Sequence, residues 1–170
     1  MIIASIFLVF PLCLALAALT DLFTMTIPNR VSVILLATFI IVAPLSGMDW
    51  QSFFMSLAAG LVVLFACFIL FAFNTMGGGD AKLLAACAAW FGFNGSLAAF
   101  LLVVAFSGGA LTLFILLLRS RSQQIMATGF PIPDSLLVAK KVPYGIAIAT
   151  AGLLTYPEAP IVQAAMRALL

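Results

Sequence analysis

Residues 52–82 read SFFMSLAAGLVVLFACFILFAFNTMGGGDAK, and this stretch establishes the class of protein. From Ser52 to Phe73 it carries no charge, and a membrane-spanning helix requires a run of about 20 apolar residues of this kind. The glycines at 77–79 then predict a turn, and Asp80 follows them directly. Because a carboxylate held at membrane depth is costly, Asp80 indicates a polar site with a function.

Apolar runs of the same kind occur on both sides of this stretch. The chain is 66% hydrophobic and 7% charged, whereas about half of the residues of a soluble domain are apolar. The first run has no Lys or Arg ahead of it, so we interpret it as a span rather than as a cleaved signal peptide. We therefore predict an all-α, polytopic integral membrane protein with one domain over residues 1–170 and six transmembrane helices, at about Ile2–Thr20, Val31–Leu45, Ser52–Phe73, Ala81–Phe93, Ser96–Leu118 and Val142–Tyr156.

The composition also excludes several functions. A net charge of +2 with scattered basic residues argues against a nucleic-acid partner. The chain has no histidine, which removes Ser-His and Cys-His catalytic pairs and most zinc sites. Its three cysteines lie in apolar runs without a Cys-x-x-Cys pair, and we interpret them as small buried side chains. We therefore expect no metal and no cofactor.

The basic residues predict the orientation, because short cytoplasmic loops accumulate Lys and Arg. With the N-terminus outside, only Arg167 lies outside. The other six then lie inside: Arg30, Lys82, Arg119, Arg121, Lys140 and Lys141. In this orientation Asp21 and Asp80 stand at the cytoplasmic ends of two helices, on the same side of the membrane.

The fourth predicted span is too short to cross the bilayer alone. From Ala81 to the turn at Asn94 it has about 13 residues, or roughly 20 Å of helix, against a hydrocarbon core of about 30 Å. Asp80 is then expected within the bilayer, below the level of the inner interface, at a helix N-terminus. Non-helical backbone at that depth is tolerated where it lines a wet cavity, so we expect a cavity beside Asp80.

Asp21 and Asp80 together suggest acid-base chemistry. Two carboxylates that share a site hold one proton between them. The ionised member can take a proton from an attacking water, while the protonated member polarises a carbonyl and then protonates the leaving amine. The alternatives are that Asp80 caps a helix and that Asp21 is an interfacial residue without a role. Lys82 is either a snorkelling, positive-inside residue or a partner that sets the charge of the pair.

These residues carry a resemblance to a known family. Gly77-Gly78-Gly79-Asp80 is a Gly-x-Gly-Asp motif followed by Ala81-Lys82, Asp21 precedes Ile27-Pro28-Asn29, and Pro143-Tyr144-Gly145 opens the last span. In this order they resemble the type IV prepilin peptidases, which are membrane aspartic peptidases. The resemblance makes Asp21 and Asp80 the catalytic pair, with Gly77, Gly78, Gly79 and Lys82 supporting the site. It gives residues 143–145 no catalytic role beyond shaping the start of the last helix.

The resemblance also implies a substrate and a location. Larger, bifunctional members carry two Cys-x-x-Cys pairs between the first two spans and N-methylate the new terminus, but the connection from Asp21 to Arg30 has no cysteine and no room for such a segment. The chain therefore resembles the short, peptidase-only form of tight-adherence (Flp-type) pilus systems, or an archaeal preflagellin peptidase. The expected partners are the lipid bilayer and prepilin or pseudopilin helices with a short basic leader, cut at the cytoplasmic face of the bacterial inner membrane.

Two other classes of protein remain as alternatives. A presenilin-like protease also carries a Gly-x-Gly-Asp motif, but its aspartates are expected near the middle of the bilayer, within longer flanking helices. A small proton-coupled transporter subunit also uses membrane carboxylates. Incubation of the purified protein with a prepilin-like peptide separates the peptidases from the transporter, which would cut nothing.

The orientation leads to a labelling prediction. A cysteine introduced at Gln123, in the loop from Arg119 to Val142, should be shielded from an impermeant thiol reagent in intact cells and should react after lysis. This result is expected because the N-out orientation places that loop in the cytoplasm. Labelling in intact cells would overturn the orientation.

Overall fold

The computed structural model describes residues 2–121 and 142–167, and in these residues the chain forms helices and no strand. The predicted cytoplasmic loop, with Lys140, Lys141 and Gln123, lies almost entirely outside the described residues. In chain order the helices are α1 (Ile2–Thr24), α2 (Asn29–Leu45), α3 (Trp50–Ala72), α4 (Gly78–Phe91), α5 (Gly95–Ser120), α8 (Tyr144–Thr155), the 3-10 turn η1 (Tyr156–Glu158) and α9 (Pro160–Arg167).

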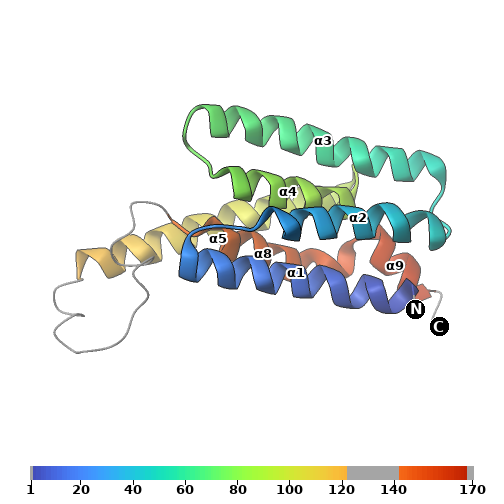
Figure 1. The fold of residues 1–170 in the computed structure, drawn as a ribbon, viewed down its shortest axis with the longest axis horizontal. Helices are drawn as coiled ribbons and strands as arrows, with labels where there is room; N and C mark the ends of the chain where they lie inside the picture. The colour runs from blue at the N-terminus through green and yellow to red at the C-terminus, as the bar shows by residue number, and fades with distance from the viewer. Residues whose placement is uncertain (1, 122–141, 168–170) are drawn as a thin grey trace.

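The helices run roughly antiparallel, with the two short helices α4 and α8 on the inside (Figure 1). Helix α4 packs against α3, α2 and α8, and α8 packs against α1 and α5. Every residue of α4 from Leu83 to Phe91 is buried. A helix that is apolar on all sides belongs inside a protein, and this explains why α4 and α8 are surrounded by longer helices.

Small residues let the helices approach closely. A Cβ added to Gly60 of α3 would lie 3.0 Å from the carbonyl oxygen of Ala85 in α4, and one added to Gly152 of α8 would lie 2.5 Å from Leu14 Cδ1 in α1. Helix association in membranes relies on such close packing, since lipid offers no hydrophobic drive to bring helices together. The glycines thus mark the crossings of inner and outer helices.

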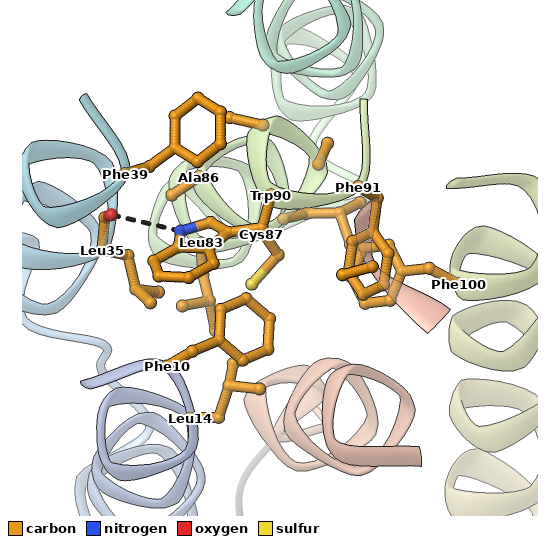
Figure 2. Close-up of a cluster of buried hydrophobic side chains, with 14 of the residues drawn as sticks. Phe10, Leu14, Leu35, Phe39, Leu83, Ala86, Cys87, Trp90, Phe91 and Phe100 are labelled. Atoms are coloured by element: carbon orange, nitrogen blue, oxygen red, sulfur yellow. Dashed lines mark hydrogen bonds between the residues drawn. The ribbon is translucent and has the colours of Figure 1, made fainter. Parts of the chain in front are cut away.

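Trp90 of α4 is at the centre of the buried apolar cluster (Figure 2). Its indole Nε1–H donates to the carbonyl oxygen of Leu35 at 3.2 Å, which satisfies its one polar group. The ring of Phe10 from α1 lies 5.0 Å from the Trp90 ring and stacks on Tyr156 at 4.6 Å. The cluster therefore joins α4 to α1, α2 and the end of α8.

The outer helices are suited to lipid. Large apolar side chains such as Leu12, Phe65 and Phe106 are exposed on α1, α3 and α5, which is the pattern of a polytopic membrane protein rather than of a soluble domain. Within residues 2–121 and 142–167, three helices are long and apolar enough to cross a bilayer, and there are up to four spans if α8–η1 and α9, bent by 42°, count as one. At 17 and 14 residues α2 and α4 are shorter, so six full spans remain a prediction.

The ends of two helices differ from those expected from the sequence. Helix α1 continues to Thr24, so Asp21 lies in its last turn rather than after it. It ends there because Met25 adopts a φ of 55° and its N–H returns to the carbonyl of Asp21 at 3.0 Å. Helix α4 begins at Gly78, so Asp80 belongs to its first turn.

The glycines at 77–79 mark the start of α4, as expected, but the chain reverses just before them. Asn74 has the positive φ, 61°, and its N–H and that of Thr75 bond back to the carbonyls of Phe71 and Leu70. This is the hydrogen-bond pattern with which helices commonly end. The glycines at 77–79 have no positive φ, so small size at Gly77 and Gly79 is required by neighbouring atoms, while a Cβ on Gly78 would make an ordinary contact.

Candidate active site

Asp21 is held by a hydrogen bond to the opposite end of the sequence. Its side chain is 5% exposed, and Oδ2 accepts from the backbone N–H of Gly145 at 2.6 Å. Gly145 lies in the first turn of α8, where backbone N–H groups lack partners within the helix and the helix dipole is positive. The carboxylate of Asp21 thus caps α8, although 124 residues separate the two in the chain.

Residue 145 must be a glycine for this contact to form. A Cβ at that position would lie 2.9 Å from both Cβ and Oδ2 of Asp21, and equally close to Ile27 Cδ1. Three atoms on two segments would have to move to admit a methyl group. The resemblance pointed to residues 143–145 without giving them a partner, and no spacing in the sequence pairs Gly145 with Asp21.

Asp80 occupies the matching place on α4. It is the acidic residue in the first turn of that helix, next to the positive end of its dipole. Its carboxylate turns back toward the start of the helix. This orientation is evident from Gly77, where an added Cβ would lie only 2.6 Å from Asp80 Oδ2. Each aspartate is therefore at the N-terminus of one of the two inner helices.

Ile27 lies between these two helix starts. A Cβ on Gly79 would be 3.2 Å from Ile27 Cβ, and one on Gly145 would be 2.9 Å from Ile27 Cδ1. The side chain is buried, at 8% exposure. Ile27 thus sets the separation between α4 and α8. In the sequence, Ile27 stands out only as part of the motif Ile27-Pro28-Asn29, and no role could be assigned to its side chain.

The two aspartates line one cavity of about 540 Å³. Its walls come from the end of α1, the connection between α1 and α2, the segment 74–80 and the start of α8. Binding sites for small ligands commonly measure about 300–1,000 Å³, so the cavity is large enough for a short stretch of peptide. A catalytic role for Asp21 and Asp80 stays a prediction, but they share a cavity as that role requires.

Tyr144 fixes the start of α8 against α5. A Cβ on Gly108 would lie 2.7 Å from Tyr144 Cε1, and the Tyr144 hydroxyl is 3.5 Å from Thr112 Oγ1. Both Tyr144 and Thr112 line the cavity. Neither was expected to line a cavity. Tyr144 was expected only to shape the start of the last helix. For Thr112, nothing in the sequence distinguishes a threonine that lines a cavity from one that only bonds its own helix.

The remaining predicted residues differ in their surroundings. The ammonium of Lys82 donates to Asn29 Oδ1 at 3.0 Å, and Lys82 lines a different cavity from the aspartates. Gly78 lines the cavity of the aspartates, yet a Cβ there would meet the Phe71 ring at 3.4 Å, an ordinary contact. In the described residues, no group of three or more His, Cys, Asp or Glu side chains is placed to hold a metal ion.

Comparison with known proteins gives one result. The family model described as the type IV leader peptidase family matches residues 8–118, which include both aspartates and all three glycines before Asp80. Neither the curated proteins nor the solved structures contain a match to this chain.

The geometry around Gly145 leads to a prediction with a matched control. Gly145→Ala should lower kcat for leader cleavage by roughly 100-fold, because displacement of a reacting group by about 1 Å costs that much. KM should change little. Gly109→Ala on α5 should cleave like the wild type, since an added Cβ there meets nothing within 4 Å and Gly109 lines neither cavity. Both should be measured at equal protein levels in membranes. Equal activity of the two variants would contradict the positioning role of Gly145.

Proposed function

We propose that this chain, which belongs to the type IV leader peptidase family, is a membrane aspartic endopeptidase that removes the leader from type IV prepilins or pseudopilins. One observation carries the proposal: two aspartates from distant parts of the chain line a single cavity. Each also lies beside the first turn of a different inner helix.

In the proposed reaction the pair holds one proton and one negative charge. The ionised carboxylate takes a proton from water as the water oxygen attacks the scissile carbonyl carbon, and the protonated carboxyl donates a hydrogen bond to the carbonyl oxygen. When the C–N bond breaks, a carboxyl group returns a proton to the leaving amine. The two aspartates then again hold one proton between them, so the enzyme is ready for the next substrate.

The structure supports the peptidase-only form of the enzyme through the connection between α1 and α2. Helix α1 ends at Thr24 and α2 begins at Asn29, so four residues join them, none of them a cysteine. This connection leaves no space for the cysteine-rich cytosolic segment that the bifunctional members carry there. We therefore propose a leader peptidase without N-methyltransferase activity, of the kind that serves Flp-type pilus systems.

The proposed location follows from the charges. The cavity lies at the end of the bundle where α1 ends and α2 and α4 begin (Figure 1). Under the positive-inside rule this is the cytoplasmic face of the bacterial inner membrane. An acidic pair there would attract a basic leader. A proton-coupled transporter subunit is the second candidate, because membrane carboxylates also serve proton transport.

The aspartates provide the decisive test. Asp21→Asn and Asp80→Asn should each lower leader cleavage by about 10⁴-fold, because an amide cannot accept water's proton, and the double variant should be little worse because the pair acts as a unit. Asp49→Asn is the matched control, since Asp49 caps α3 at the far end of the bundle through Ser52 N–H and asparagine caps as well. Lys82→Ala should have only a mild effect. A single Asn variant that still cleaves well would remove that aspartate from the mechanism.

The mechanism also predicts the response to inhibitors. Cleavage should persist in EDTA and after treatment with serine- or cysteine-directed reagents, because the reacting groups are carboxylates and the chain has no histidine to activate another nucleophile. The measurement is leader removal from a prepilin peptide by the purified protein. Activity lost in EDTA and restored by a divalent ion would contradict the aspartic mechanism, and no cleavage under any condition would favour the transporter.

A further inference from the structure

A second cavity, of about 600 Å³, lies beside the site and is almost entirely apolar. We call it the α2/α3/α4 groove, after the helices that line it between Asn29 and Leu36, Leu57 and Leu64, and Lys82 and Ala89. On each helix the first and last lining residues are seven positions apart, which is about 10 Å of helix, so the groove runs for roughly two helical turns. Several side chains on its rim, Leu61 among them, are exposed. The groove is thus open to the lipid.

The groove exists because α3 packs on α4 and hardly touches α2 (Figure 1). On α4, the residues that line the groove after Lys82 all have small side chains, namely Ala85, Ala86 and Ala89. Ser32 of α2 is also small. Small residues on a membrane helix allow the backbone of a neighbouring helix to come close. These small residues are buried and form the floor of the groove, whereas Val33, Leu36, Leu61 and Leu64 are exposed along its rim. The rim therefore offers an apolar helix a surface on which to pack.

The groove and the cavity of the aspartates meet at Asn29. This residue lines both of them, and its side-chain oxygen accepts the hydrogen bond from Lys82 at the polar end of the groove. Asn29 and Lys82 are also the first polar groups that a chain leaving the groove would meet. A segment that runs along the groove toward its polar end is therefore led into the cavity that holds Asp21 and Asp80.

We infer that the α2/α3/α4 groove holds the apolar helix of the substrate while the bond to be cut lies in the adjoining cavity. The inference rests on the proposed function, which supplies a substrate with an apolar helix directly after the cut. The continuity at Asn29 favours this occupant over a lipid, because only a polypeptide would use a passage from an apolar groove to a pair of carboxylates. A lipid molecule becomes an outcome of the test.

The test compares two substrates with the same leader and cleavage site. One is a full-length prepilin with its helix, and the other is a peptide that ends a few residues after the cut. Leu36→Trp and Leu64→Trp enlarge side chains that line the groove, and Leu102→Trp on α5 is the matched control because it is an exposed leucine outside the groove. We expect the groove variants to raise KM for the prepilin about tenfold, as disturbed packing between membrane helices would. Cleavage of the short peptide should not change.

A crosslinking experiment gives an independent measurement. With Asp80→Asn to prevent turnover, a photoreactive benzoylphenylalanine at Leu64 should crosslink to the helix of the prepilin, and the same group at Leu102 should not. Equal effects of Leu64→Trp on both substrates, or crosslinks at Leu64 to lipid alone, would overturn the inference. A wild-type protein that cleaves neither substrate would instead overturn the proposed function, and crosslinks from Leu64 to the prepilin helix would still support the groove.

Discussion

The hydrogen bond between the Gly145 N–H and the Asp21 carboxylate organises the polar end of this molecule. A carboxylate taken out of water needs a donor, and a backbone N–H in the first turn of a buried helix needs an acceptor, so each group offsets part of the cost of burying the other. The bond also closes the bundle, since it joins the first long helix to the last inner one. A glycine is required at 145 because any side chain would occupy the place of the carboxylate.

The two inner helices place both carboxylates in equivalent positions. Helices α4 and α8 are short, apolar and largely buried, and both begin at the same end of the bundle, where their N-terminal dipoles face a cavity. Ile27 fills the space between the two helix starts, and the glycines at 79 and 145 allow it to do so. These two helix starts therefore line a cavity at the end of a bundle whose outside is covered by apolar side chains.

The outer and inner helices differ in the surfaces that they form. Helices α1, α3 and α5 expose large apolar side chains, whereas buried alanines of α4 form the floor of the groove between α2 and α3. In the proposed enzyme this groove receives the apolar part of the substrate and the cavity receives its polar part. Asn29 belongs to both, so the transition from helix to extended chain in the substrate would occur beside it.

Composition and the order of residues were enough to identify a membrane protein of apolar helices, the two aspartates and their position at one end of the bundle. These features follow from local properties, namely hydropathy along a run, turn residues and the distribution of basic charge. The sequence could not show that Asp21 caps α8, that Ile27 separates the two helix starts or that Lys82 bonds Asn29, because each contact joins segments distant in the chain. It also could not show that Gly77 and Gly79 must be small, since a glycine that makes a turn and one that admits a neighbouring atom look alike until the neighbour is in place.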